Sequence, residues 1–433
     1  MTLSAWLAAQ YYAWRPWLPE RLLYHPDFFR VLALLELDPA LGAAQAKVRL
    51  RHILVDALTH VPYYRDNVPV TPGEARHEPL HEVFARFPLL SKDQVMAQQR
   101  AFLDQRFDPR KLLYATSGGS SGQGIGMWRS KRVADIEKAF FTREWGRFGF
   151  SFSKSRTLRI GADARRLAHE SPWRLVGNRL MLSPYHVNPR HREAIGGAIR
   201  RFQPAFVHAY PSSAAALAEL LSPDDIAVPP KAVLLASEPA TNLQLAAIAR
   251  LFRCPISLNY GLCERTNLAF ASHVDGVTSP YVFDPLYSCS ENRVADGRAE
   301  IVGTSLWNDV MPLIRYRTGD YGLIEPDGRC AAIDGRGHEF LVDRYGNHIP
   351  GLAIVIDEST WDFVRLYQVR QTRPGAISLA VVGRHGPLSA AQKGFLQHAQ
   401  RRRWGGFFDI AIEEESDIPL AANGKRRLVV GLP

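Results

Sequence analysis

Small side chains and hydroxyl groups gather in one stretch of the chain, SGGSSGQGIG, from Ser117 to Gly126. Glycine adopts positive φ without strain and lets a backbone approach a ligand closely. Consecutive backbone N–H groups in such a turn form a concave site for anions, and Ser120 and Ser121 would add hydroxyl donors. Phosphate oxygens suit this chemistry, and a flexible surface loop is the alternative. The spacing is not that of a Walker loop, since no Gly-Lys-Ser/Thr follows, nor the G-x-G-x-x-G of a dinucleotide-binding turn.

The composition indicates a globular protein of more than one domain. The chain has 433 residues, 46% hydrophobic and 22% charged, which is enough to bury a large core. Its cysteines are scattered without a C-x-x-C pair, at Cys254, Cys263, Cys289 and Cys330. This spacing argues against a disulfide scaffold and a zinc ribbon, and it predicts a reducing, cytoplasmic compartment.

The net charge of +10 would attract nucleic acid, anionic lipid or phosphorylated small molecules. No nucleic-acid motif is present and the basic clusters are short, so we expect mostly solvated surface charge and no nucleic-acid partner. We also expect no transmembrane segment, because no stretch is long and apolar enough. The aromatic residues of the N-terminal segment are predicted to pack as a helix, with peripheral membrane contact through tryptophans as the alternative. The oligomeric state stays open.

Periodicity predicts several helices. From Pro39 to about Val61 apolar residues recur at helical spacing, which assigns one buried face to Val48, Leu50, Ile53, Leu54 and Leu58. Ser91 is a candidate N-cap for the next helix, and another helix is expected over residues 133–147. Residues 112–114 are predicted to end a buried strand just before the Ser/Gly stretch.

Strand-like and helix-like segments alternate after residue 157. TLRIG is followed by loops, PAFVHAYPSS and KAVLLASEP are each followed by a helical segment, and CPISLNYG is followed by LCERTN. This alternation predicts an α/β domain with a mostly parallel sheet, whose ligands bind at the carboxyl ends of the strands. The loops HAYPSS, ASEP and NYGLCE lie at such ends. GRAEIVGTSL and GLIEPDGRCAAI are expected to pair antiparallel instead.

Six separated segments, considered together, identify a family. They are SGGSSGQG, ASEP, NYGLCE, YRTGD, DGRGHEFLVDRYGN and ANGKRR. In order and spacing they resemble the adenylate-forming superfamily of acyl- and aryl-CoA synthetases. HVPYYRDN and FPLLSKDQV resemble N-terminal segments of its phenylacetate–CoA ligase branch and the capsular-polysaccharide-associated relatives. The resemblance covers nearly the whole chain.

The resemblance implies an α/β fold of two domains. A large N-terminal domain, residues 1–337, would have parallel and mixed sheets flanked by helices and would bind ATP and the acyl substrate. A small mobile α+β C-terminal domain, residues 338–433, would carry the catalytic lysine. The family usually has an aspartate at the hinge between them, where this chain has His338.

The Ser/Gly stretch matches the family's phosphate-binding loop. The residues that would surround the β- and γ-phosphates of ATP are Ser117, Gly119, Ser120, Ser121 and Gly122. The chain departs from the family at the next two positions, where Gln123 replaces the loop lysine and Gly124 the proline. One positive charge on the leaving pyrophosphate is therefore missing, and magnesium and other basic residues must do more.

The resemblance places the base of the nucleotide against two motifs. Glu238 and Pro239 match the adenine-side loop, and Tyr260, followed by Gly261, matches the aromatic residue that stacks on adenine. Core packing is the alternative role for Tyr260. Glu264 matches the acidic residue that serves the ATP-bound Mg²⁺, which prefers oxygen ligands. Cys263 stands where the family has a hydroxyl that touches the α-phosphate, so a tolerated substitution is favoured over a catalytic nucleophile.

Three further matches complete the implied site. Asp320 matches the carboxylate that accepts hydrogen bonds from both ribose hydroxyls, while the adjacent Arg317 could equally form a structural salt bridge. Arg336 matches the arginine that reaches the ribose and phosphate. Lys425, in NGKRR, matches the catalytic lysine that would bridge the substrate carboxylate and the α-phosphate.

The implied reaction is attack of a carboxylate on the α-phosphorus of ATP, which gives an acyl-adenylate and pyrophosphate. Rotation of the small domain would then admit the acceptor. Candidate acyl-pocket residues are His208, Tyr210 and Ser212, whose apolar and aromatic surroundings suit an aryl or small acyl group. The acceptor could be CoA, the phosphopantetheine of a carrier protein, an amine or a hydroxyl. No structural zinc is expected, and a binding or scaffold homologue that has lost catalysis stays as the alternative from another class.

Overall fold

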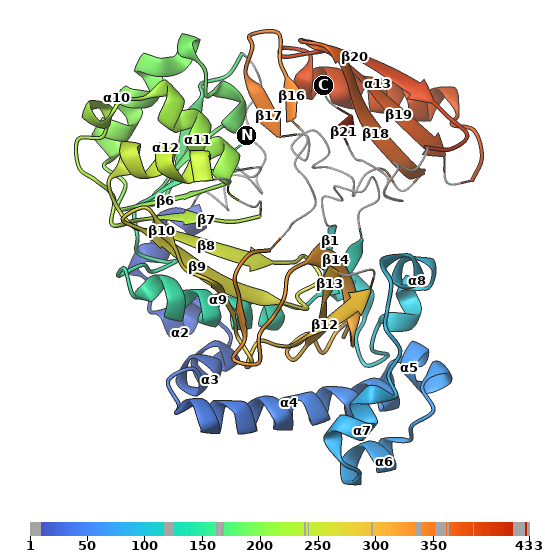
Figure 1. Ribbon diagram of the computed structural model, residues 1–433. Coiled ribbons are helices and arrows are strands. Elements are labelled where there is room, and N and C mark those ends of the chain that lie inside the picture. Colours follow the sequence, from blue (N-terminus) through green and yellow to red (C-terminus); the bar gives the residue numbers. More distant parts are fainter. Residues whose placement is uncertain are drawn as a thin grey trace.

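The computed structural model describes residues 10–116, 125–161, 164, 169–237, 240, 242–295, 298–333, 340–350, 361, 363–383, 385–418 and 429–430. Figure 1 shows a large mixed α/β unit and, at one end, a smaller C-terminal unit of sheet and helix. The predicted fold class is confirmed. The boundary between residues 337 and 338 lies outside the described residues, so the domain limits and the mobility of the small domain stay predictions.

Helices form the N-terminal part of the large unit; apart from α4 they are short, and many of them begin with a proline. They are η1 (Arg15–Trp17), α2 (Glu20–Leu23), α3 (Pro26–Leu34), α4 (Pro39–His60), α5 (Pro62–Asn67), α6 (Pro72–His77), α7 (Leu80–Ala85), α8 (Lys92–Ala97), η2 (Gln99–Phe102) and η3 (Pro109–Lys111). Ser91 caps α8 as predicted, in a reciprocal capping box with Gln94. The predicted packing of the N-terminal aromatic residues is wrong for Trp14 and Trp17, which are 64% and 81% exposed.

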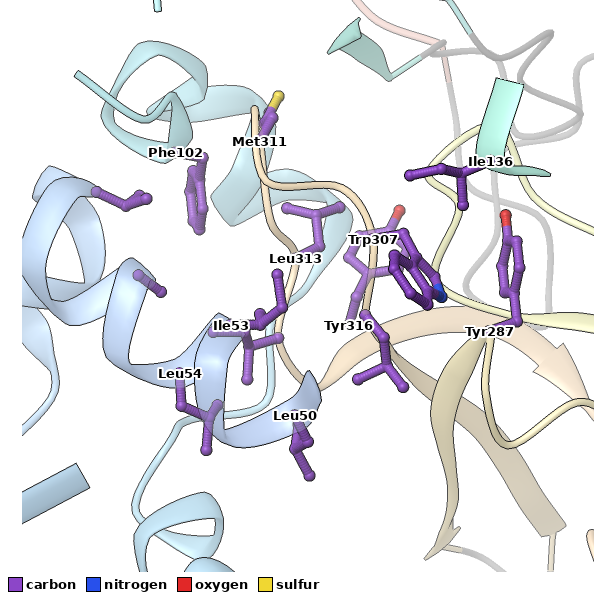
Figure 2. Packing of buried hydrophobic residues seen from close by; sticks show 14 of the residues in the cluster. Leu50, Ile53, Leu54, Phe102, Ile136, Tyr287, Trp307, Met311, Leu313 and Tyr316 are labelled. Carbon is purple, nitrogen blue, oxygen red and sulfur yellow. The ribbon is translucent and has the colours of Figure 1, made fainter. Parts of the chain in front are cut away.

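The buried face of α4 differs from the prediction at one residue. Leu50, Ile53, Leu54 and Leu58 are buried, but Val48 is 61% exposed. At 100° per residue Val48 lies on the opposite side of the helix from Leu50, so the five residues cannot share one face. Figure 2 shows Leu50, Ile53 and Leu54 packing in one cluster with residues from the segment 307–316. This packing holds in place the segment that leads into the strand of residues 316–321.

A two-stranded ribbon frames the Ser/Gly stretch. Strand β1 (Leu113–Thr116) pairs antiparallel with β2 (Gly126–Arg129), so that Thr116 lies opposite Gly126. The predicted strand is present, but it is not buried, since Leu113 is 62% and Tyr114 46% exposed. The ribbon has no third strand among the described residues, which leaves its outer side chains in solvent.

The central sheet is mixed and follows the order β15-β11-β9-β8-β7-β6-β3-β5-β4, with β10 paired to β9. Its strands are β3 (Thr157–Ile160), β4 (Trp173–Val176), β5 (Arg179–Leu182), β6 (Phe206–Ala209), β7 (Ala232–Leu235), β8 (Ile256–Gly261), β9 (Leu268–Val274), β10 (Val277–Thr278), β11 (Tyr281–Phe283) and β15 (Arg329–Cys330). The five strands β5, β3, β6, β7 and β8 run parallel, and the strands on either side of them run antiparallel. The predicted parallel centre is therefore confirmed.

Helices cover both faces of this sheet (Figure 1). One face packs on α10 (Arg192–Phe202), α11 (Pro211–Leu220) and α12 (Asn242–Phe252), and the other on α9 (Lys131–Gly146) through Trp145. The short helices η5 (Pro184–His186), η6 (Pro189–His191) and η7 (Pro223–Asp225) lie in the connections. This arrangement places the ends of β6, β7 and β8 side by side at one edge.

The segment LCERTN after β8 forms a turn. The chain reverses there and returns antiparallel as β9. Arg265 has φ +58 in this turn, and its N–H donates to the carbonyl of Leu262. A left-handed residue such as Arg265 lets the chain reverse its direction within a few residues.

A second, antiparallel sheet contains β12 (Ser288–Ala295), β13 (Arg298–Ser305) and β14 (Tyr316–Tyr321). The antiparallel pairing predicted for GRAEIVGTSL is confirmed by β13, and that for GLIEPDGRCAAI by the two residues of β15 that pair with β11. Strand β14 also meets Leu90 through a single parallel bridge.

The C-terminal unit has its own core. It contains β16 (Phe340–Val342), β17 (His348–Pro350), β18 (Val364–Arg373), β19 (Ala376–Gly383), α13 (Ala390–Trp404), β20 (Asp409–Glu414) and β21 (Val429–Val430). A four-stranded sheet, ordered β20-β19-β18-β21, packs on α13 through Leu396 and Trp404. The ring of Phe407 lies 5.8 Å from that of His186, which brings this unit against η5 of the large unit.

Candidate functional site

Strand β14 presents alternate side chains of YRTGDY to the interior. Tyr316, Thr318 and Asp320 are buried, while the residues between them are partly exposed. The hydroxyl of Thr318 donates to the carbonyl of Ile301 at 2.8 Å and accepts from the N–H of Asp320 at 3.0 Å. Gly319 has φ +75, a conformation that glycine adopts without strain. The local backbone is thereby fixed, and Tyr316 and Asp320 point to the same side.

Asp320 lies beside Tyr260 at the end of β8. The Tyr260 hydroxyl donates a hydrogen bond of 3.0 Å to Oδ2 of Asp320. The ring of Tyr260 also packs against the ring of Phe283, with ring centroids 5.8 Å apart. An aromatic face and a carboxylate, predicted from motifs 60 residues apart, are thus in contact.

Glu264 lies in the turn after β8 and is only 3% exposed. Its Oε1 accepts a hydrogen bond of 3.0 Å from the hydroxyl of Tyr316, which is fully buried. Among the described residues the Glu264 carboxylate has no second hydrogen-bond donor and no ion pair. One oxygen is therefore held by the protein, and the other accepts no hydrogen bond from a described residue.

Cys263 contacts a cation rather than a base. Nη2 of Arg129 lies 2.5 Å from the carbonyl oxygen and 2.8 Å from Sγ of Cys263. Burial raises the pKa of the Cys263 thiol, although Arg129 opposes the shift. A neutral thiol is a poor nucleophile, so the geometry agrees with the interpretation of Cys263 as a tolerated substitution.

Arg317 forms the structural salt bridge that was one of its two alternatives. Its Nε lies 2.9 Å from Oε2 of Glu300, which is 4% exposed and also lies 3.4 Å from Arg293. Arg317 belongs to the partly exposed set of β14, on the side away from Asp320. The pair ties β14 to β13.

Two candidate acyl-pocket residues lie at the carboxyl end of β6. His208 packs edge-on against Trp145, with ring centroids 5.2 Å apart. Burial lowers the pKa of His208 well below its usual range, and the charges of Arg159 and Arg179 add to the shift, so the imidazole is neutral at pH 7. Tyr210 directly precedes α11, and Ser212 lies in the first turn of that helix. In the sheet, strand β7 lies between β6, where His208 lies, and β8, where Tyr260 lies.

No protein-family model matches the chain. The structure is similar to crystal structures of 2-hydroxyisobutyryl-CoA ligase. One, with 2-HIB-AMP and CoA in the thioesterification state, has a TM-score of 0.54 and 15% identity over 91% of this chain and 90% of that chain. Another, in the postadenylation state, has a TM-score of 0.51 and 18% identity over the same shares of the two chains. The chain has the fold of adenylate-forming ligases. Protein CapK of Staphylococcus aureus is 20% identical over 370 residues, which are 80% of this chain and 79% of CapK.

Several predicted residues of the site lie outside the described residues. They are Ser117, Gly119, Ser120, Ser121, Gly122, Gln123, Gly124, Glu238, Pro239, Arg336, His338 and Lys425. The elements that flank two of these groups are described. The ribbon β1–β2 flanks the Ser/Gly stretch, and Ser237, at φ +73, precedes Glu238 in an unusual backbone conformation.

Two residues of the candidate site, Tyr316 and Arg129, were not predicted from the sequence. The signal for Tyr316 was present, because strand alternation puts it on the same face as Asp320. The signal for Arg129 was weaker. It follows the Ser/Gly stretch by three residues, but nothing local indicates that it reaches Cys263, 134 residues later.

Nδ1 of His273, on β9, shares a 2.8 Å hydrogen bond with the hydroxyl of Thr278. In the described ranges, no group of three or more His, Cys, Asp and Glu side chains could hold a metal ion. In those same ranges no helix has the length and apolar character needed to cross a bilayer.

Proposed function

We propose that this protein activates a carboxylic acid with ATP to form an acyl-adenylate. The observation that supports it best is the pair of contacts made by β14. On one side of this strand Asp320 meets Tyr260, and Tyr316 meets Glu264, at hydrogen-bond distances of 3.0 Å. A platform for a base, a ribose acceptor and a cation ligand thus converge where neighbouring strands end, which is where ligands bind in such sheets.

The nucleoside would bind between Tyr260 and Asp320. The Tyr260 ring can stack on adenine, while the carboxylate of Asp320 accepts hydrogen bonds from the two ribose hydroxyls. Glu238, Pro239 and Gly261 would border the base, and Arg336 would add a donor to the ribose and phosphate.

The Glu264 carboxylate fits one ligand of an ATP-bound Mg²⁺. Magnesium sites with nucleotides use one or two carboxylates together with phosphate oxygens and water. In the described structure one oxygen of Glu264 is oriented by Tyr316 and the other has no protein donor. When bound there, Mg²⁺ would reduce the negative charge on the phosphate oxygens.

The reaction would form one bond and break another at the α-phosphorus. A carboxylate oxygen attacks, and the bond to the β-phosphate oxygen breaks, which releases pyrophosphate. Donors from Ser117, Gly119, Ser120, Ser121 and Gly122 would stabilise the leaving group. Lys425 would hold the attacking carboxylate against the α-phosphate, and the two-domain division at residues 337 and 338 would let this lysine move away afterwards.

The acyl group would lie near His208, Tyr210 and Ser212. A neutral His208 packed on Trp145 makes this end of β6 partly apolar, which suits an aryl or small acyl group and favours the phenylacetate–CoA ligase-like branch. The proposed acceptor is CoA, which the similar 2-hydroxyisobutyryl-CoA ligase binds. A carrier-protein phosphopantetheine, an amine or a hydroxyl are the acceptors that the test must separate.

The test is carboxylate-dependent exchange of labelled pyrophosphate into ATP, with a panel of aryl and short-chain acids. At least one acid should support exchange, and Lys425→Ala should reduce it by orders of magnitude while ATP binding by calorimetry persists. Lys393→Ala is the control, since Lys393 is a half-exposed lysine of α13 paired with Glu414. If ATP binds but no acid gives exchange, the protein is a binding homologue and the proposal is wrong. The accepted acid is then incubated with CoA or hydroxylamine to identify the acceptor.

A further inference from the structure

We propose that Arg129 is the phosphate-binding cation of this site and replaces the lysine that the Ser/Gly stretch lacks at Gln123. This inference rests on the proposed function. The arginine lies on β2, the strand that directly follows the stretch, and pairs with Leu113 across the ribbon. Its side chain reaches the turn after β8, where Cys263 and Glu264 lie.

The charge of Arg129 is not balanced by the protein. In the described part of the chain no carboxylate lies within 4.0 Å of its guanidinium, and its buried Nε has no hydrogen-bond partner. Arginines elsewhere around this site are paired: Arg265 with Glu137 at 2.6 Å, Arg317 with Glu300 at 2.9 Å and Arg315 with Glu291 at 2.8 Å. A partly buried cation without a counter-ion is costly, and a bound anion would remove that cost.

The position of the guanidinium indicates which anion. Nη2 lies 2.8 Å from Sγ of Cys263, the residue beside the proposed magnesium ligand Glu264. A phosphate that contacts this turn would therefore lie beside the same guanidinium, where Nη1 has no hydrogen-bond partner among the described residues. The planar guanidinium keeps its charge at every physiological pH and holds its N–H donors in fixed directions, which suits a phosphate oxygen. The ligand class is a polyphosphate, and in the proposed reaction it is the leaving pyrophosphate of ATP.

Cys263 acquires a positioning role in this arrangement. Its carbonyl and its neutral thiol both accept from Nη2, which orients the fork of the guanidinium. The N–H groups of Arg129 then take the place of the hydroxyl donor that the family has at the position of Cys263. As the bond to the β-phosphate oxygen breaks, negative charge grows on that oxygen, and Arg129 stabilises it by hydrogen bonding without transferring a proton.

The test compares Arg129→Met and Arg129→Lys with Arg49→Met. Arg49 is a matched control, because its Nη2 also donates to a backbone carbonyl, that of Leu306 at 2.8 Å, and its Nε is also buried without a partner. It lies at α4 over Trp307, away from the nucleotide. The readouts are calorimetric binding of magnesium pyrophosphate, the exchange rate with its KM for ATP, and rescue of Arg129→Met by added methylguanidinium.

Arg129→Met should lower the exchange rate by about 100-fold or more, as loss of one donor aimed at developing charge does. Pyrophosphate should bind at least about 10-fold more weakly, with recovery in methylguanidinium, while Arg49→Met changes neither quantity. Arg129→Lys keeps the charge without the fork and should fall between. If Arg129→Met does not fold, Arg129→Lys is the variant used for the test.

Three results would overturn the proposal. The first two are wild-type pyrophosphate binding in folded Arg129→Met or Arg129→Lys, and an equal loss of binding in Arg49→Met; the third concerns exchange. Wild-type exchange that Arg129→Met leaves intact would reject the role of Arg129 and leave the proposed function standing. If no acid supports exchange in the wild type, yet Arg129→Met still loses pyrophosphate binding, the arginine is confirmed as the anion ligand and the adenylation is contradicted.

Discussion

At the scale of single residues, the chemistry depends on how side chains hold one another. Glu264 and Asp320 each accept a hydrogen bond from a tyrosine, and Cys263 accepts from an arginine. In each contact the donor fixes a group to which the proposed function assigns a ligand. The three following predictions test these contacts separately.

Tyr316→Phe should raise the Mg²⁺ concentration at half-maximal exchange by about 10-fold, because groups that orient a metal ligand affect affinity at this scale. Tyr64→Phe is the control. The Tyr64 hydroxyl is equally buried and bonds to Pro312 and Ile314 in the core. Both variants should lose stability, and only Tyr316→Phe should change the magnesium midpoint. An unchanged midpoint would show that Tyr316 does not orient a metal ligand.

Asp320→Ala should weaken ATP binding by about 3 kcal/mol at most, the contribution of charge-assisted hydrogen bonds. Calorimetric titration with AMP measures it. Asp327→Ala removes a carboxylate that is 61% exposed in a nearby turn and should leave affinity unchanged. Equal affinities of wild type and Asp320→Ala would exclude the ribose assignment.

Cys263 should react slowly with iodoacetamide at pH 8. Burial raises its pKa, so less thiolate is present at this pH than in an ordinary thiol, and the reaction should accelerate only at higher pH. Peptide mapping measures the rate, with the urea-unfolded protein as reference. Cys263→Ser and Cys263→Thr should retain exchange. Fast alkylation at pH 8, or complete inactivity of both variants, would support a nucleophile instead.

At the scale of elements, the sequence predicted the parallel centre of the sheet and the helices α4, α9, α11 and α12. It carried no prediction for the turn of residues 262–267. The polar residues Glu264, Arg265 and Asn267 are buried there, and their partners are Tyr316, Glu137 and Ser290. All three partners are remote in the sequence, so local periodicity carries no signal for them. The prediction that Val48 is buried was wrong for a simpler reason. It counted apolar residues along the helix but ignored the angle between them.

Gly303 of β13 tests how tightly this turn is packed. A Cβ there would lie 2.0 Å from Oδ1 of Asn267 and 2.4 Å from the carbonyl oxygen of Thr266. Gly303→Ala should therefore destabilise the fold by about 1–3 kcal/mol. Gly197→Ala, inside α10 with only the end of Arg201 nearby, should stabilise it by about 1 kcal/mol. Urea denaturation measures both, and a neutral Gly303→Ala would show that the turn can move.

At the scale of the whole molecule, the proposed site spans both units of the fold. The β14–β8 contacts belong to the large unit, whereas Lys425 comes from the C-terminal part of the chain. Motif matches in the sequence could identify these residues individually. Their assembly into one active centre depends on how the two units of the fold come together, which no local motif encodes.

The central claim is that the acid becomes an acyl-adenylate, and transfer of oxygen isotope tests it most directly. The acid that best supports exchange is labelled with ¹⁸O in its carboxylate and incubated with ATP, Mg²⁺ and the accepted nucleophile. Attack of the carboxylate on the α-phosphorus leaves one of its oxygens on that phosphorus, so AMP should contain one ¹⁸O atom per turnover and pyrophosphate none. Label in inorganic phosphate or ADP, or label that stays entirely in the acid and its product, would contradict the account.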